Sequence, residues 1–133
     1  MTTGRKRADG FTLVELMIVM AIIVILAGMA TALYVNSIQR SKEAVLKSDL
    51  FRMRDAIDQY YADKNKYPAS LDALVSEKYL RTVPVDPMTN STDTWQTTMA
   101  EPQPGSSFSD TGIFDVKSGA EQTALDGTRY ADW

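Results

Sequence analysis

An apolar run of 20 residues, 16–35, dominates the N-terminal part of this chain and is interrupted only by Gly28 and Thr31. At the standard rise of an α-helix it spans about 30 Å, which matches the hydrocarbon core of a bilayer. A secretory signal peptide has a shorter apolar region with a small-residue cleavage site after it. Here the small residue Gly10 precedes the run, so processing would leave the anchor in place. The run therefore predicts a helix that lies in a membrane or against other copies of itself.

Glu15 is the only charged residue between Asp9 and Arg40. A carboxylate at membrane depth costs about 2.5–3.5 kcal/mol on insertion scales, so it needs a counter-charge or a function. Cleavage between Gly10 and Phe11 would free an α-amino group close to Glu15, in the same chain or in a neighbour. The alternative interpretation is a carboxylate that lies at the interface and is wetted by lipid headgroups.

From Ser37 onwards the pattern becomes amphipathic. Apolar residues recur at steps of four, three, four and three, which is the α-helical period: Leu46, Leu50, Met53, Ile57 and Tyr60. No proline occurs before Pro68. We therefore expect a single helix over residues 11–64, whose apolar stripe packs against the C-terminal part of the chain.

A short second helix is predicted directly after Pro68. Ser70 is a good N-cap residue, and Asp72 in the first turn favours the helix dipole. The predicted buried face of this helix comprises Leu71, Leu74, Val75 and Tyr79.

Strand patterns follow in the last third of the chain. Residues 92–99 and 113–117 predict two strands, the first with Trp95, Thr97 and Met99 on one face. Residues 101–112 are rich in Pro, Ser and Gly and predict an exposed loop, and residues 118–133 are mostly irregular. We expect an α+β fold, with a two- or three-stranded antiparallel sheet laid against the long helix.

Charge and composition exclude several functions. The net charge is −3, and without residues 1–10 the chain has 11 basic and 16 acidic residues, a net charge of −5. This balance argues against nucleic acid as the main partner. The chain has no Cys and no His, which excludes disulfides and removes the usual general base. Because no phosphate loop or catalytic constellation is visible either, we do not expect an enzyme.

Residues 10–16, Gly-Phe-Thr-Leu-Val-Glu-Leu, resemble the prepilin cleavage motif of type IV pilins and type II secretion pseudopilins. The resemblance implies that a membrane peptidase cuts after Gly10 and methylates Phe11. It implies that Glu15 pairs with the liberated amine during assembly. It also divides the chain into a leader (1–10), a transmembrane assembly helix (11–36), an amphipathic extension (37–66) and a small globular domain (67–133).

The second half of the chain is similar to the major pseudopilin of type II secretion. The similarity rests on Asn65-Lys66-Tyr67-Pro68, Pro84-Val85-Asp86-Pro87, residues 113–121 and the closing Ala131-Asp132-Trp133. Ala32 and Met88 depart from the family pattern, which often has a proline and an aromatic residue at these places. A divergent branch, such as a related filament protein with another cargo, would account for both departures.

The resemblance also implies calcium in the C-terminal loop. Calcium takes six to eight oxygen ligands from carboxylates and main-chain carbonyls. Carried over to this chain, the best-placed ligands are Asp126 and Asp132, with Glu121 as a further acid and carbonyls near residues 118–125. The alternative is that these acids are solvated loop residues.

The function that the resemblance implies is that of a structural subunit in a pseudopilus that drives protein export. The implied partners are further copies of the chain, the prepilin peptidase/methyltransferase, other pseudopilins, the inner-membrane assembly platform with its motor ATPase, and membrane lipid before assembly. The implied location is the bacterial inner membrane, crossed once, with the C-terminal domain in the periplasm and the filament there or at the cell surface. The alternatives are the major subunit of a type IV pilus, for adhesion, motility or DNA uptake, and a membrane-anchored periplasmic domain that never polymerises.

Overall fold

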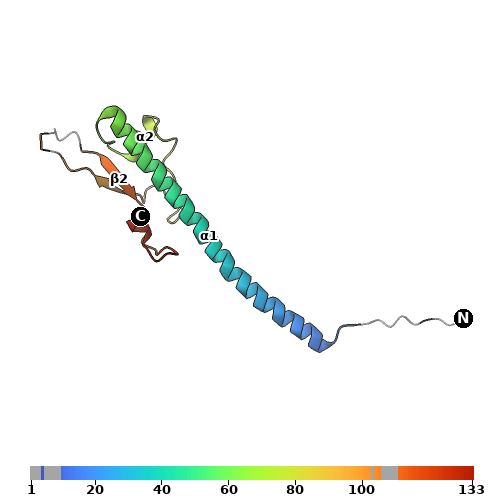
Figure 1. Cartoon of the computed structure of the whole chain (residues 1–133). Coiled ribbons are helices and arrows are strands. Elements are labelled where there is room, and N and C mark those ends of the chain that lie inside the picture. The colour runs from blue at the N-terminus through green and yellow to red at the C-terminus, as the bar shows by residue number, and fades with distance from the viewer. Residues whose placement is uncertain (1–3, 5–9, 103, 106–110) are drawn as a thin grey trace. The chain divides into compact units, whose positions relative to one another are not determined.

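The computed structural model describes residues 4, 10–102, 104–105 and 111–133. The described elements are α1 (Leu13–Lys64), α2 (Leu71–Ser76), β1 (Gln96–Met99), β2 (Ile113–Lys117) and the 3₁₀ helix η2 (Tyr130–Asp132) (Figure 1). The chain divides into two compact units, Met1–Ser37 and Ile38–Trp133. The α+β class predicted from the sequence is confirmed.

Helix α1 confirms the predicted single helix. It ends at Lys64, where Asn65 adopts the left-handed conformation with φ of 53° and donates its N–H to the carbonyl of Tyr61 at 2.8 Å. Asn tolerates this conformation better than most residues, so it ends a helix well. In the described part of the chain, α1 is the helix that is long and apolar enough to cross a membrane, by length and composition.

The core of the second unit forms around the predicted stripe of α1. Its five residues are all buried, and α2, β2 and the C-terminal residues add their apolar side chains to the same cluster. Burying one Leu or Ile side chain contributes about 1.5–3 kcal/mol, so this stripe supplies much of the cohesion of a small unit. The cluster comprises Leu46, Leu50, Met53, Ala56, Ile57, Tyr60, Leu74, Trp95, Ile113, Val116, Ala120, Ala124 and Tyr130.

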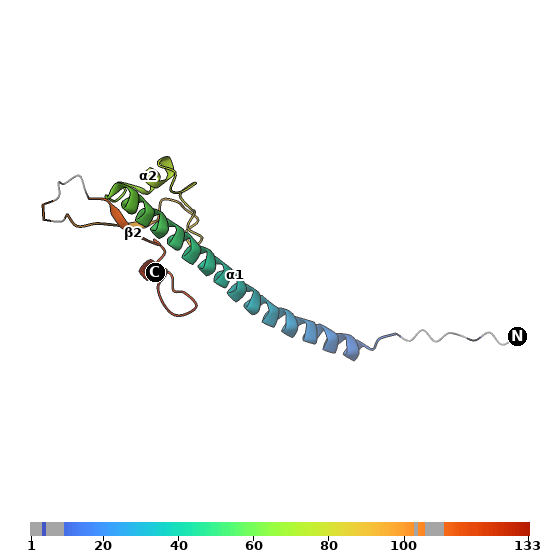
Figure 2. The same cartoon turned by 45° about the horizontal axis from the view of Figure 1, so that its top comes forward.

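Helix α2 begins as the sequence predicts. The hydroxyl of Ser70 accepts a hydrogen bond from the N–H of Ala73 at 3.2 Å, so Ser70 is the N-cap. Leu74 is fully buried, and Leu71 and Tyr79 pack against the core as partly buried residues. The helix lies beside the C-terminal end of α1 (Figure 2).

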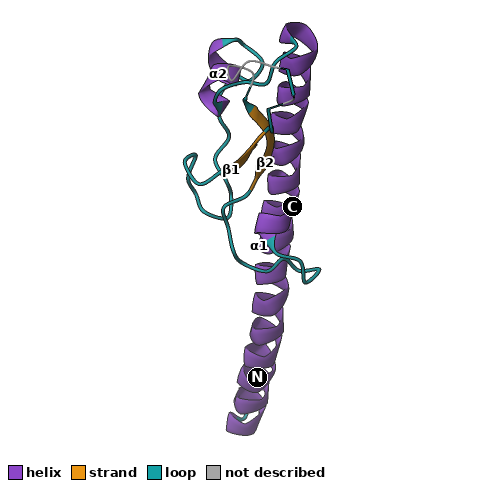
Figure 3. Cartoon of the chain, turned by 90° about the vertical axis from the view of Figure 1, so that its left-hand side faces the viewer, coloured by secondary structure: helices purple, strands orange, loops and turns teal. Residues whose placement is uncertain are grey.

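Strands β1 and β2 form a two-stranded antiparallel sheet that lies alongside α1 (Figure 3). Gln96 pairs with Lys117 and Met99 with Ile113, and a register shift between Thr98 and Met99 leaves Phe114 as an extra residue in β2. The second strand is the one predicted. The predicted loop at 101–112 lies partly outside the described residues; residues 101, 102, 104 and 105 are exposed as predicted, whereas Thr111 is half-buried and Gly112 is buried.

The first strand is shorter than predicted: it covers Gln96–Met99, whereas the sequence pattern predicts residues 92–99. All four residues of β1 are exposed, whereas Trp95, just before it, is buried and donates its indole N–H to the carbonyl of Pro84 at 2.8 Å. Residues 86–91 form a closed turn, in which the N–H of Asp86 donates to the carbonyl of Ser91 at 3.0 Å. Residues just before β1 contact this region instead of β2, since the N–H of Asp93 donates to the Ser91 hydroxyl at 3.1 Å.

Candidate functional site

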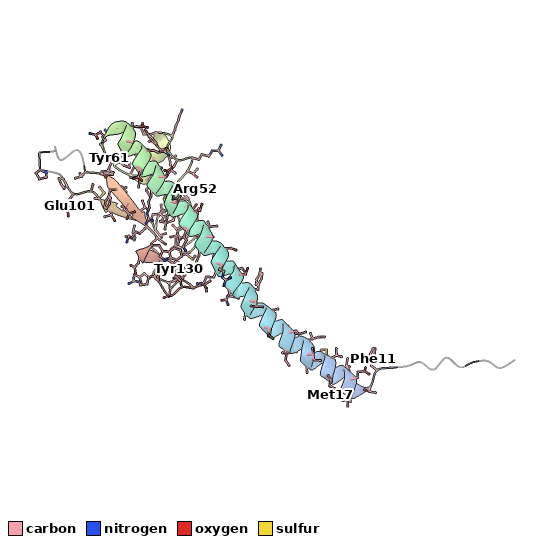
Figure 4. The ribbon with its side chains drawn as sticks, viewed as in Figure 1. Phe11, Met17, Arg52, Tyr61, Glu101 and Tyr130 are labelled. Carbon is pink, nitrogen blue, oxygen red and sulfur yellow. The ribbon has the colours of Figure 1, made fainter. Side chains whose placement is uncertain are left out.

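The first part of α1 presents apolar side chains on every face. All residues from 11 to 38 are exposed, and their large apolar side chains are 40% to 85% exposed. Figure 4 labels Phe11, just before α1, and Met17 in its first turns. An apolar surface of this extent is not stable in water, so it requires lipid or other apolar helices.

Thr12 and Glu15 together form the start of α1. The main-chain N–H of Glu15 donates to the Thr12 hydroxyl at 3.2 Å, and the N–H of Leu16 donates to the Thr12 carbonyl at 3.1 Å. Thr12 is therefore the N-cap and Glu15 the third helical residue, which is the Thr-x-x-Glu spacing of a capping box. A carboxylate in the first turn also interacts favourably with the helix dipole. Thr12 was not predicted as an N-cap residue, although the Thr-x-x-Glu spacing directly before an apolar run indicates one.

The predicted processing site lies directly before this cap. Gly10 and Phe11 are described and exposed, whereas most of the predicted leader, residues 1–3 and 5–9, lies outside the described residues. Cleavage after Gly10 and methylation of Phe11 therefore stay predictions. The α-amino group that such cleavage would create belongs to Phe11, which directly precedes the N-cap residue Thr12.

The three acids predicted to bind calcium are all exposed, but they are held differently. Asp126 and Asp132 line the same hollow, next to α1, and Glu121 does not line it. The Asp126 carboxylate accepts two hydrogen bonds at one oxygen, from the Thr128 hydroxyl at 2.6 Å and the Thr128 N–H at 2.9 Å. These hydrogen bonds lower the pKa of Asp126.

This arrangement does not fit a calcium site made of the three acids. Among the described residues, no group of three or more Asp, Glu, His or Cys side chains is placed to hold a metal ion. The hollow that Asp126 and Asp132 share is also lined by Lys47, Arg54 and Arg129, whose positive charges oppose a cation. Calcium binding therefore stays a prediction from the resemblance, with no support from the donor set.

Arg54 makes the most contacts of the cations around this hollow. Its Nε donates to Asp115 Oδ1 at 2.9 Å, and its Nη2 donates to the carbonyls of Val116 at 2.9 Å and Trp133 at 2.6 Å. It thereby connects α1 to β2 and to the C-terminal residues. Nothing in the local sequence around Arg54 marks it for this role.

Glu43 makes a second connection between α1 and the C-terminal residues. Its Oε1 accepts from the Tyr130 hydroxyl at 2.8 Å and from the N–H of Leu125 at 2.9 Å. Gln39 Nε2 donates to the Tyr130 hydroxyl at 3.0 Å. Burial of its phenol raises the pKa of Tyr130. Tyr130 lies beside α1 in Figure 4.

Asp86 is a buried polar residue that the sequence did not single out as structural. It is fully buried, and its carboxylate accepts from the Ser118 hydroxyl at 2.5 Å and from the N–H of Met88 at 2.8 Å. These hydrogen bonds offset the cost of burying a carboxylate and hold the turn before β1 against the end of β2.

Comparison with known proteins shows to which family this chain is related. Residues 5–31 match the family described as the prokaryotic N-terminal methylation motif. Type II secretion system core protein G of Aeromonas hydrophila is 30% identical over 102 residues, covering 65% of this chain and 71% of that protein. The protein of the same name from Pseudomonas aeruginosa is 32% identical over 102 residues, covering 65% of this chain and 72% of that protein. This chain belongs to the type II secretion system core protein G family.

Membership of the core protein G family confirms the resemblance to a major pseudopilin. A similarity to pilins exists as well: fimbrial protein EcpC of Eikenella corrodens is 40% identical over 81 residues, covering 57% of this chain and 53% of that protein. No solved structure matches the chain. The Thr12–Glu15 start of α1 and the apolar residues up to Thr31 fall within the matched methylation motif.

Proposed function

We propose that this chain is the structural subunit of a pseudopilus, a filament that drives protein export in a type II secretion system. The observation that carries this proposal is the exposed apolar surface of residues 11–38. Membership of the core protein G family supports it. Copies of the chain bury this surface against one another in the filament and in lipid before assembly. The role is structural, and the chain is not an enzyme.

Glu15 is the residue that sets the register between copies. In an apolar filament core an unpaired carboxylate is costly, whereas a carboxylate paired with the amine of Phe11 from an adjacent copy is tolerated. Removing one member of a buried ion pair costs about 3–5 kcal/mol. The pairing requires cleavage after Gly10, because only cleavage creates the amine. The matched methylation motif supports this processing step.

The partners and location follow from the same proposal. A prepilin peptidase processes the chain, and an assembly platform with a motor ATPase in the inner membrane extracts it, together with other pseudopilins. The C-terminal unit lies in the periplasm. The described residues hold one helix apolar enough to cross a membrane, and residues 11–133 as a whole have a net charge of −5, which is consistent with this location.

A type IV pilus is the second candidate, and the similarity to EcpC favours it. That match covers 53% of EcpC, whereas the matches to core protein G cover 71% and 72% of those relatives. The secretion filament is therefore the better supported of the two. Sheared surface material distinguishes them, because a pilus gives long surface fibres and a pseudopilus gives short ones or needs overexpression.

Glu15→Gln tests the assembly mechanism, because it removes the charge and keeps the size of the side chain. The full chain is expressed with the secretion machinery, and membrane fractionation, the mass of the N-terminus and electron microscopy of sheared material are measured. We expect normal insertion and loss of filaments. Glu101→Gln, the same exchange at an exposed glutamate outside residues 11–38, is the matched control and should assemble.

Two results would contradict different parts of the proposal, the pairing of Glu15 and the structural role of the chain. Normal filaments from Glu15→Gln would show that the carboxylate does not pair with the amine, while the structural role would stand. A native chain that keeps residues 1–10 in cells and gives no filament would remove the structural role itself.

A further inference from the structure

Two cationic side chains of α1 hold Trp133 from two directions. Arg54 Nη2 donates to the Trp133 carbonyl at 2.6 Å, and the Lys47 ammonium lies 4.6 Å from the centroid of the Trp133 indole ring. Lys47 and Arg54 are seven residues apart, which is two helical turns, so both reach the same side of α1. A cation over an aromatic face is attracted by the ring quadrupole.

Trp133 also contacts other residues of the C-terminal segment, which we define as residues 118–133. Its indole N–H donates to the Thr128 hydroxyl at 2.7 Å, and that hydroxyl donates to Asp126 at 2.6 Å. Its ring also packs edge-on against Tyr130, with the ring centroids 5.1 Å apart. The two cations therefore act, through Trp133, on the loop that contains Asp126.

The oxygen atoms around Arg54 are of the kind that calcium prefers. They are one carboxylate oxygen, from Asp115, and two main-chain carbonyl oxygens, from Val116 and Trp133. The guanidinium already satisfies all three. A divalent cation here would meet the charge of Arg54 at close range and would have to displace it.

We propose that Arg54, assisted by Lys47, supplies the positive charge that orders the C-terminal segment, and that this segment folds without a divalent cation. Arg54 connects α1 to β2 and to the last residue described, at partners that are 61 to 79 residues away from it in sequence. Its side chain takes the structural part that the family resemblance assigns to calcium. The inference concerns the Ile38–Trp133 unit and holds whether or not the chain polymerises.

Hydrogen–deuterium exchange followed by mass spectrometry tests this directly. The full chain in detergent micelles is compared in excess EGTA and in about 5 mM calcium, which exceeds the weakest affinities of extracellular calcium sites. We expect equal amide protection of residues 118–133 in both conditions. Arg54→Met should speed exchange in this segment about tenfold, because each hydrogen bond to a charged group is lost. Calcium should not restore the protection.

Matched variants separate charge from geometry. Arg54→Lys keeps the charge but cannot bind three oxygens in a fixed plane, so it should restore only part of the protection. Lys47→Met should have a smaller effect than Arg54→Met, since it removes only the contact with the indole ring. Lys42→Met, an exposed lysine of α1 outside these contacts, should change nothing.

The amides of residues 46–60 serve as an internal reference for global unfolding. Loss of protection there in Arg54→Met would mean that the variant fails to fold. The proposal is then tested by the amide protection of the native chain in EGTA and in calcium. Protection of residues 118–133 that falls in EGTA and returns with calcium overturns the proposal. Unchanged protection in a folded Arg54→Met overturns it as well.

Discussion

The N–H of Glu15 donates to the hydroxyl of Thr12 at 3.2 Å, so the residue proposed to join subunits also belongs to the first turn of α1. The two roles are compatible. The capping contact uses the main-chain N–H of Glu15 and leaves its carboxylate available. The dipole of the helix favours a negative charge at this end, so an acidic residue is well placed in the first turn.

Thr12→Val separates the capping role from the charge. The change removes the hydroxyl and keeps the shape, and loss of an N-cap costs about 1 kcal/mol of helix stability. We expect faster amide exchange in the first turn of α1 and a reduced filament yield, with insertion retained. The loss should be smaller than that caused by Glu15→Gln.

Thr12→Ser is the matched control, because it keeps a hydroxyl that can cap. If Thr12→Val abolished filaments as completely as Glu15→Gln while Thr12→Ser assembled, the hydroxyl would matter for assembly beyond capping. The order of effects proposed above would then be wrong.

Gly119→Ala should destabilise the second unit. A Cβ at Gly119 would overlap the carbonyl oxygen of Thr94, which is main chain and cannot move easily. Overpacking of this kind costs about 1–3 kcal/mol, so the unfolding midpoint of the unit should fall. Gly28→Ala is the control, since a Cβ there meets nothing within 4 Å, and it should leave the midpoint unchanged. Equal midpoints for both variants would show that residues 94 and 119 are not in close contact.

The sequence predicts the parts of the fold that depend on local periodicity. The α1 stripe, the Ser70 cap and strand β2 appear as expected, because helical spacing, capping chemistry and alternation act over a few residues. The start of β1 was predicted too early, because Trp95, just before the strand, donates its indole N–H to the carbonyl of Pro84, 11 residues earlier, and does not pair with β2. No pattern near residue 92 reports that contact.

The C-terminal segment shows the same limit more strongly. Its acids suggested a cation, and the structure places two cationic side chains of α1 there. Lys47 and Arg54 look like ordinary solvated positions of an amphipathic helix. Their role appears only once the fold brings Trp133 against that side of α1.

Asp49→Asn should make the unit less sensitive to pH. Asp49 is buried on α1, and loss of hydration raises its pKa; Asp86 raises it further and Arg52 opposes the rise. The native state therefore binds this proton more readily than the unfolded state. The resulting stability is complete below the unfolded pKa of about 3.9 and is lost as pH rises through the native pKa.

Denaturant unfolding at several pH values measures this effect. At neutral pH the Asn variant should be more stable than the native chain, and the difference should shrink as the pH falls toward about 4. Asp58→Asn, an exposed acid of the same helix, should show no such trend. A gain for Asp49→Asn that is constant with pH would contradict the role assigned to the buried charge.

Tyr130→Phe tests the second connection between α1 and the C-terminal segment. The change keeps the buried ring and removes the hydroxyl that donates to Glu43 at 2.8 Å. A hydrogen bond to a charged group contributes about 1.5–3 kcal/mol, so unfolding in denaturant should become easier by about that amount. Tyr61→Phe is the control, because its ring stacks on Tyr67 at 4.5 Å and its hydroxyl makes none of the described hydrogen bonds.

The same variant distinguishes the two connections. Because Arg54 and Lys47 hold Trp133 independently of Glu43, Tyr130→Phe should speed amide exchange around residues 123–125 more than at Thr128, which the Trp133 indole holds. Uniform loss of protection over residues 118–133 would mean that the segment is one cooperative unit. In that case Arg54 would share its ordering role equally with Glu43, since breaking either connection would release the whole segment.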